Sequence, residues 1–338
     1  MTPFQRYLLN KLFWYLLAFV AAVALNFFLP RLIPGNPVDA IVAQMSQGGS
    51  TSGEAMKRIY ETYVTEFGLD KSPLEQFWSY LTNLLRGDLG TSLGNYPASV
   101  NSLIKAALPW TLALQLPTIL LGWILGNILG ALAAYKGGWT DRGAFLGSLL
   151  FSSIPYYGLA ILLLYTFAVA LPWFPTGGAY SFASSPSFTW GFLTDAFHHY
   201  FLPFASLLLI VIGGQAIGMR SMAIYELGAD YVGYERSLGL REGRIVRGIF
   251  RNAVLPQITG LALSIGSLAG GALLTEIVFS YPGLGTVLFD AIRQNDYPVI
   301  QAVTMLITAA VLAANFVVDL TYGLIDPRIR TAQQGAGA

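Results

Sequence analysis

Six long apolar stretches alternate with more polar segments along the chain. A helix that crosses the hydrocarbon core of a bilayer needs about 20 mainly apolar residues. The stretches that come close to this length are 12–32, 110–135, 145–171, 202–219, 258–279 and 299–324. The pattern therefore predicts an all-α integral membrane protein with six transmembrane helices.

The segment between the first two stretches, residues 33–106, is too long for a simple connector. Its runs "SGEAMKRIYETYVTEFGL" and "SPLEQFWSYLTNLL" place apolar residues at helical spacing with polar faces between them. Ser72, followed by Pro73 and Glu75, is typical of a helix start. We expect a small extracytoplasmic helical insertion, which either caps the membrane bundle or docks an outside partner.

Composition supports the assignment to the membrane. Of the 338 residues, 54% are hydrophobic and 11% are charged, whereas soluble domains have about 25% charged residues. The net charge of +1 offers no electrostatic basis for binding nucleic acid. The N-terminus is basic and then apolar without a small-residue cleavage site, so we expect an uncleaved first span rather than a signal peptide.

Lysine and arginine positions predict the orientation, because short cytoplasmic loops are enriched in both residues. With the N-terminus inside, the short outer loops lie near 172–200 and 280–298, and Arg293 is their only lysine or arginine. Both termini are then cytoplasmic. The expected organisation is a first transmembrane helix at 1–32, an insertion at 33–106, a five-helix core at 107–325 with a cytoplasmic loop at 220–256, and a cytoplasmic tail at 326–338.

Three glycines recur on one face of the second apolar stretch. Gly122, Gly126 and Gly130 are spaced four residues apart, and such stripes of small residues let membrane helices approach closely. Close helix packing is the main interpretation, and the lining of a passage is the alternative.

The connector 230–256, "DYVGYERSLGLREGRIVRGIFRNAVLP", contains five arginines and three acids in an otherwise oily chain. Asp230 is the expected N-cap of a short helix and Gly239 its expected C-terminal stop. A second helix is expected over 242–252, before Pro256 opens the fifth span. It places on one face Arg244, Arg247 and Arg251. This pattern predicts a stiff cytoplasmic protrusion, whereas an ordinary basic loop would need only the arginines.

The motifs of ATP hydrolysis and of zinc proteolysis are missing from the sequence. Gly-Lys never occurs, so the chain has no Walker A motif. His198 and His199 are adjacent and belong to no H-E-x-x-H motif, which argues against a metal role. We therefore expect a transport subunit rather than an enzyme, with no cofactor in this chain.

The connector resembles the cytoplasmic EAA loop of binding-protein-dependent ABC importer permeases. In the oligopeptide/dipeptide branch, this loop reads approximately D-Y-V-x-x-A-R-A-K-G-L and ends in R-N-A-x-L-P. Further matches to that branch follow in the right order, namely "PGNP" at 34–37, "GLD" at 68–70, "GDLGTSL" at 87–93, "LPWTLAL" at 108–114, "TEIVFSYPGLGTVLFDAIRQNDYPVIQA" and "NFVVDLTYGLIDPRIR". The loop departs from the branch at Glu235, Leu238 and Arg241.

The resemblance implies a type I ABC importer permease fold. It also implies partners: a second, related permease forming a heterodimer, two ATP-binding subunits that hold ATP and Mg, and an extracytoplasmic solute-binding protein. The short helix would enter a groove on the ATPase. The coupling residues implied are Asp230, Tyr231, Val232, Tyr234, Glu235, Arg236, Ser237, Leu238, Gly239, Leu240, Arg244, Arg247 and Arg251.

Two aspects of function remain open at the level of sequence. Cargo is either peptides or oligosaccharides such as cello- and xylo-oligosaccharides, and a self-contained secondary transporter is the alternative to an ABC subunit. Glu276, an acid late in the fifth apolar stretch, is either part of an outer gate or a packing residue, since acids within membrane helices are costly and usually functional or paired.

Overall fold

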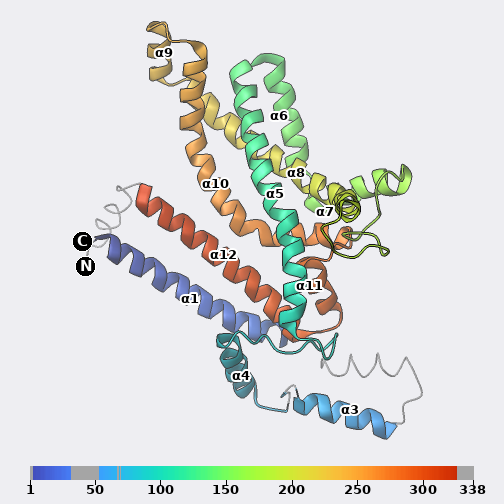
Figure 1. Ribbon diagram of the computed structural model, residues 1–338. Helices are drawn as coiled ribbons and strands as arrows, with labels where there is room; N and C mark the ends of the chain where they lie inside the picture. Colours follow the sequence, from blue (N-terminus) through green and yellow to red (C-terminus); the bar gives the residue numbers. More distant parts are fainter. Residues whose placement is uncertain (1–2, 32–52, 67, 69, 326–338) are drawn as a thin grey trace. The chain divides into compact units, whose positions relative to one another are not determined.

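The computed structural model describes residues 3–31, 53–66, 68 and 70–325, and the regular elements in this part of the chain are helical (Figure 1). They are α1 (Pro3–Arg31), α3 (Gly53–Glu66), α4 (Pro73–Leu85), α5 (Val100–Lys136), α6 (Gly138–Ser153), α7 (Tyr156–Leu164), the π-helix η1 (Tyr165–Ala170), α8 (Trp190–Leu227), α9 (Asp230–Ser237), α10 (Glu242–Val278), α11 (Leu284–Arg293) and α12 (Tyr297–Ile325). The "PGNP" motif at 34–37 and the expected tail at 326–338 lie outside the described residues.

Four described helices are long and apolar enough to cross a membrane. These are α1 over Gln5–Arg31, α5, α8, and α12 over Tyr297–Val317. A bent pair, α6 with α7 and η1, makes a fifth when it is counted as one span. The predicted stretch 258–279 lies almost entirely within α10, but the side chains of 262–272 lie outside the described set. The all-α membrane architecture is therefore confirmed, with four to five such spans.

The third predicted stretch is not one continuous helix. The chain bends by 96° between α6 and α7, so the prediction of a single helix over 145–171 is wrong. Ile154 has an extended backbone, with φ −83° and ψ 131°, directly before Pro155. The residue before a proline is pushed out of the helical region by the proline ring, which accounts for the break.

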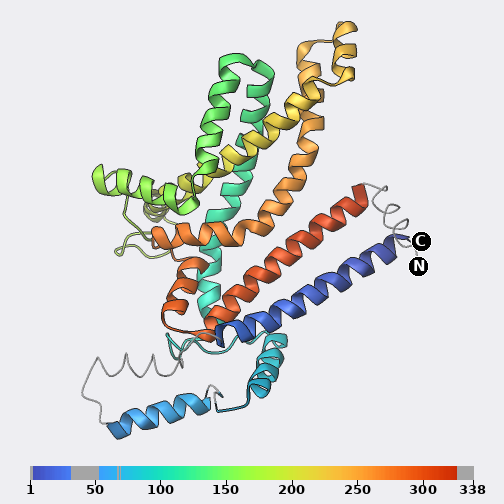
Figure 2. The same cartoon turned by 180° about the vertical axis from the view of Figure 1, so that it is seen from behind.

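The chain divides into two compact units, residues 1–109 with 283–312, and residues 110–282 with 313–338. In the first unit, α1 and α12 run side by side (Figures 1 and 2). The Asn26 side chain donates a hydrogen bond of 2.6 Å to the backbone oxygen of Gln301 and accepts one from Thr304. Such polar contacts hold membrane helices together where burial of apolar surface provides no driving force.

The predicted start of α4 is confirmed in the first unit. Ser72 and Glu75 form a reciprocal capping box, in which the Ser72 backbone N–H donates to the Glu75 carboxylate at 3.0 Å. These hydrogen bonds hold the pKa of the exposed Glu75 carboxyl below its ordinary value. Further along the unit, the buried Asp296 accepts hydrogen bonds from the Ser92 hydroxyl and the Gly94 N–H, so "GDLGTSL" and "NDYP" meet there.

In the second unit, α8 packs against α6, α7 and α10. The glycine stripe of α5 faces α8. A Cβ atom would lie 2.8 Å from the Ile212 carbonyl oxygen at Gly126, and 2.3 Å from that of Ala216 at Gly130. Neither position leaves room for a side chain, so the predicted close helix packing is confirmed.

Candidate coupling site

The predicted protrusion is present at one end of the second unit (Figure 1). The short helix α9 lies between the end of α8 and the start of α10. Val232 at 1% exposure, Ile245 at 0% and Ile249 at 5% form a small core between α9 and α10. The side chains of Leu227 and Leu240 pack against this core. The protrusion therefore has its own apolar base, which makes it stiffer than a loop would be.

The C-terminus of α9 is closed by a left-handed glycine, as predicted. Gly239 has φ +68°, and its N–H donates to the Arg236 carbonyl at 3.0 Å. The next N–H, of Leu240, donates to the Glu235 carbonyl at 3.2 Å. This pair of hydrogen bonds is a Schellman motif, which satisfies carbonyl groups that a helix end leaves unpaired.

The predicted N-cap is wrong by one residue. Ala229 has the extended cap conformation and makes no side-chain capping bond, whereas Asp230 is the first helical residue. Its carboxylate still stands in the first turn, where the partial positive charge of a helix N-terminus favours an acid.

A polar cluster joins the three helices at the base of the protrusion. The Tyr231 hydroxyl donates to the Glu226 carboxylate at 2.6 Å and accepts from the Asn252 side-chain amide at 3.2 Å. Glu226 lies at the end of α8 and Asn252 in α10. These hydrogen bonds among Tyr231, Glu226 and Asn252, which we call the latch, therefore fix α9 to both neighbouring helices. Burial, followed by the bond to Glu226, raises the pKa of Tyr231, and the hydroxyl therefore stays protonated.

Glu226 and Asn252 were not among the predicted coupling residues. The sequence did point to Asn252, because it belongs to the Arg-Asn-Ala run at 251–253 that matches the family loop, just as Tyr231 belongs to the matching Asp-Tyr-Val run at 230–232. Nothing in the sequence pointed to Glu226, since it lies before the matched segment 230–256.

The outer surface of α9 is exposed. Tyr234 is 67% exposed and Leu238 58%, and Arg236 and Ser237 are also exposed. Arg236 lies 3.8 Å from Glu242, a surface pair of the kind that contributes little to stability. Glu235 is half-buried. The remaining predicted residues on α10 are all exposed, namely Arg244, Arg247 and Arg251.

The second helix of the protrusion continues into the predicted fifth span. α10 passes through Pro256 without ending, so the prediction that Pro256 opens a new helix is wrong. Proline lacks the N–H that would bond to the carbonyl four residues earlier, but membrane helices tolerate proline where neighbours compensate. The Trp123 indole N–H donates to the Gln257 carbonyl at 2.8 Å and ties α5 to this part of α10.

α10 is a long continuous helix. Its 37 residues measure roughly 55 Å along the helix axis at 1.5 Å per residue, and the helix bends along its course (Figures 1 and 2). At the far end, Glu276 lies in the last turn and is fully buried, and its backbone carbonyl accepts the Tyr281 N–H at 2.8 Å. One helix therefore links the α9 protrusion to the acid predicted as a gate residue.

The two histidines lie in α8 and contact backbone oxygens. A ring nitrogen of His198 is 2.8 Å from the Trp173 carbonyl oxygen, and one of His199 is 2.9 Å from that of Asp195. In the part of the chain that the structure describes, no group of three or more His, Cys, Asp or Glu side chains could hold a metal ion.

Comparison with known proteins identifies the family. Residues 126–331 match the model of the binding-protein-dependent transport system inner membrane component. The chain is 35% identical over 327 residues to the di/tripeptide transport system permease protein DppB of Pseudomonas aeruginosa, which covers 92% of this chain and 95% of DppB. It is also 32% identical over 326 residues to the glutathione transport system permease protein GsiC of Pectobacterium atrosepticum, with 96% and 98% covered. The same figures hold for GsiC of Salmonella typhimurium. The chain therefore belongs to the family of binding-protein-dependent transport system inner membrane components, the permease subunits of ABC importers.

Proposed function

We propose that this chain is a permease subunit of an ATP-driven peptide importer, and that α9 receives the movement of a partner ATPase. The observation that carries the coupling role is the α9 protrusion, which exposes Tyr234 and Leu238 while its base is locked to α8 and α10. Coupling needs both the exposed contact surface and the fixed base, because a loosely attached loop would move by itself and would not transmit the movement of the ATPase to α8 and α10.

Peptides are the cargo that the relatives favour. The relatives described above are named for di/tripeptides or glutathione, so the oligosaccharide alternative gains no support from them. A self-contained secondary transporter is likewise disfavoured, because the matched family consists of components of binding-protein-dependent systems.

The proposed assembly follows from the family. This chain pairs with a second, related permease in the inner membrane, two ATP-binding subunits lie on the cytoplasmic side, and a solute-binding protein delivers cargo from outside. The chain contributes six transmembrane helices, with α10 supplying the fifth in chain order and the bent pair the third. Both termini and α9 are cytoplasmic, and residues 33–106 are extracytoplasmic, as the distribution of lysine and arginine supports.

The proposed coupling path runs from α9 into the membrane. The docking surface comprises the exposed residues of α9 and the adjoining arginines of α10. When the ATPase groove moves, the apolar base and the latch at Tyr231 transmit the movement to α8 and α10. Glu276, at the other end of α10, then moves with the helix as part of an outer gate.

The experiment is reconstituted transport. The chain, its companion permease, the ATPase subunits and the binding protein are placed in liposomes, and uptake of a labelled tripeptide is measured with ATP. We expect ATP-dependent uptake that unlabelled tripeptide inhibits and cello-oligosaccharide does not. Inhibition by the oligosaccharide alone would contradict the cargo assignment, and ATP-independent uptake by this chain alone would contradict the subunit assignment.

The coupling role needs a separate variant. Val232→Asp places an unpaired charge in the apolar base and should abolish uptake while the ATPase subunits remain catalytically intact. The matched control, Thr140→Asp, adds the same charge at an exposed position of α6, outside the docking surface, and should leave uptake unchanged. If both variants transported as well as the unmodified chain, α9 would not be the coupling element.

A further inference from the structure

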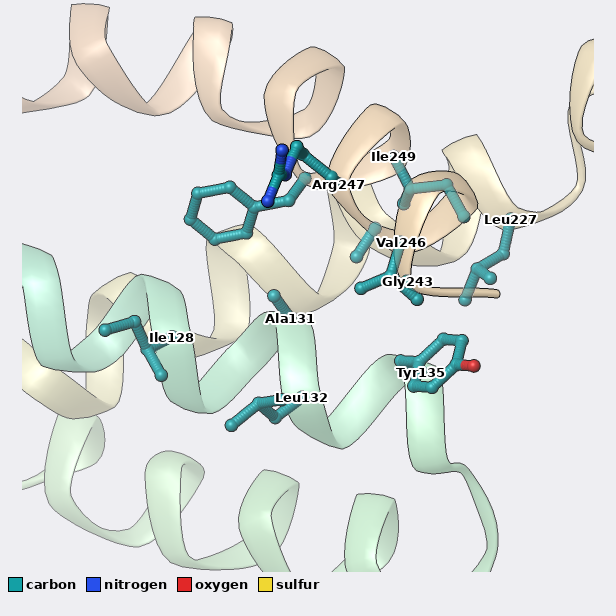
Figure 3. A pocket seen from close by; sticks show the side chains of 11 residues that line it. Ile128, Ala131, Leu132, Tyr135, Leu227, Gly243, Val246, Arg247 and Ile249 are labelled. Carbon is teal, nitrogen blue, oxygen red and sulfur yellow. The ribbon is translucent and has the colours of Figure 1, made fainter. Parts of the chain in front are cut away.

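Two cavities in the described part of the chain differ in chemistry. The groove in Figure 3 is lined mainly by apolar side chains, among them Ile128 of α5 and Val246 of α10. Arg247 also lines this groove and belongs to the proposed docking surface for the ATPase, so the groove is part of the coupling site. The second cavity, of about 570 Å³, lies in the first unit and is lined mainly by polar side chains. Its size is typical of sites for small molecules.

Three helices and two connecting segments line the polar cavity. Arg31 comes from the end of α1, Gln76 from α4 and Gln301 from the start of α12. The connecting segments are 68–71 and 88–91. In the proposed orientation, α1 ends and α12 begins on the extracytoplasmic side of the membrane. The polar cavity therefore lies on the side from which cargo arrives.

Arg31 is held in place but its hydrogen-bonding capacity is only partly used. Its guanidinium carbon lies 3.5 Å from the centroid of the Phe27 ring. Nη1 donates to the Phe27 carbonyl oxygen at 2.7 Å, and Nε and Nη2 donate to Gln76 Oε1 at 3.4 and 3.3 Å. A guanidinium has five N–H donors, so one N–H on each of Nη1 and Nη2 has no acceptor among the described residues. No carboxylate in the described part of the chain forms an ion pair with Arg31.

The other polar groups of the cavity match the remaining parts of a peptide. Lys71, which is exposed, adds a second positive charge. Of the described residues that line the cavity, Asp88 is the only acid; it is exposed, and one of its oxygens accepts the Gly90 N–H at 2.9 Å. Asn83 and Gln301 carry side-chain amides, which donate and accept hydrogen bonds as peptide groups do. The cavity therefore complements a molecule that has a carboxylate, an ammonium group and amides.

We propose that the polar cavity binds a short free peptide, with its C-terminal carboxylate on Arg31 and its N-terminal ammonium group on Asp88. A guanidinium–carboxylate contact is a charge-assisted hydrogen bond, which is stronger than a neutral one. Because Arg31 already stacks on Phe27, little side-chain freedom is lost when the peptide binds. This inference rests on the proposed function, which supplies the peptide cargo and the extracytoplasmic position of the cavity.

The test is isothermal titration calorimetry of the purified full chain in detergent. Trialanine is compared with trialanine amide, which lacks the C-terminal carboxylate. We expect trialanine to bind about tenfold more tightly, the effect of one hydrogen bond to a charged group. Arg31→Gln should bind the two peptides equally, and it should bind the amide as the unmodified chain does, which an unfolded variant would not. Arg86→Gln, which removes an exposed arginine outside the cavity, should keep the preference for trialanine.

A second pair of variants tests the ammonium end. Asp88→Asn should abolish the preference for trialanine over N-acetyl-trialanine and keep the preference for the free carboxylate. Asp290→Asn, the matched control, removes the same charge at an exposed position of α11 outside the cavity and should keep both preferences.

Three results would overturn the proposal. Equal affinity of the unmodified chain for trialanine and its amide would exclude the carboxylate contact, and equal losses in Arg31→Gln and Arg86→Gln would reduce the effect to general attraction. If no peptide bound, but Arg31→Gln weakened binding of the solute-binding protein to the importer, the carboxylate would be an acidic side chain of that protein and not a free peptide. Because the titration uses no ATPase and no transport, its failure is distinguishable from failure of the proposed function.

Discussion

Replacing Gly239 tests the stiffness of the protrusion with the fewest side effects. Nothing lies within 4 Å of a Cβ built on this residue, so a new side chain would not clash with its surroundings. The cost arises from the backbone, because φ is +68° and left-handed conformations cost L-residues roughly 1–2 kcal/mol. We expect Gly239→Ala near the lower end of this range and Gly239→Val, with its branched Cβ, at or above the upper end.

This penalty should appear as opening of the α9 terminus. A loss of about 1–2 kcal/mol changes a folded-to-open ratio by roughly 5–30-fold. The amide hydrogens of Gly239 and Leu240 should therefore exchange with solvent faster by this factor, because both are hydrogen-bonded in the Schellman motif. In the reconstituted importer, the valine variant should hydrolyse ATP with reduced tripeptide uptake.

Gly233 provides the matched control. It lies inside α9, a Cβ there also meets nothing within 4 Å, and its φ is not positive. Gly233→Ala should therefore stabilise α9 by about 0.5–1 kcal/mol, and it should not speed exchange of the Gly239 and Leu240 amides. If Gly239→Val showed unmodified exchange rates and fully coupled transport, a stiff, glycine-capped α9 would not be required.

Three further predictions concern the helix packing, the latch and the insertion. Gly130→Ala forces a Cβ against a backbone carbonyl of α8 and should destabilise the chain by about 1–3 kcal/mol, measured as thermal unfolding in detergent. Gly147→Ala, whose Cβ would meet open space, should not destabilise the chain, and equal melting curves for the two variants would contradict the packing described here. Tyr231→Phe removes the hydroxyl that bonds to Glu226 and Asn252 and should lower the free energy of unfolding in denaturant by about 1–3 kcal/mol. Tyr234→Phe, at an exposed position, should leave the free energy of unfolding unchanged, and the reverse order of effects would refute the role of the Tyr231 hydroxyl. Because the pKa of Glu75 is lowered in the folded state, the stability that its carboxylate contributes to the start of α4 is present above its ordinary pKa of 4.5 and is lost as the pH falls through the folded pKa. Amide protection at the start of α4, corrected for intrinsic exchange rates, should therefore fall in acid. Glu75→Gln should remove this pH dependence.

Hydropathy predicted where the four to five described membrane helices lie, but not where they bend or end. The stretch 145–171 has an apolar average that conceals Pro155, and the proline decides the local backbone. At Pro256 the opposite happened, because a proline expected to start a helix lies within α10. The same residue type breaks one segment and is tolerated in the other, and the difference depends on neighbouring helices that a single sequence does not reveal.

The candidate site was predictable where its chemistry is local. The short helix and its glycine stop depend on neighbouring residues, so spacing alone located Gly239. The latch depends on residues that meet only after folding: Glu226 and Asn252 are 26 positions apart and come together through Tyr231.

The most direct test of the coupling role is cross-linking from α9 in the assembled importer. The chain contains no cysteine, so Tyr234→Cys introduces a single reactive thiol on the exposed surface of the helix. We predict that a short thiol cross-linker joins it to a cysteine in the surface groove of the ATPase, with a yield that changes between ATP-bound and nucleotide-free states. Failure to form this cross-link, with the same thiol labelled from outside intact cells by a membrane-impermeant maleimide, would contradict the account.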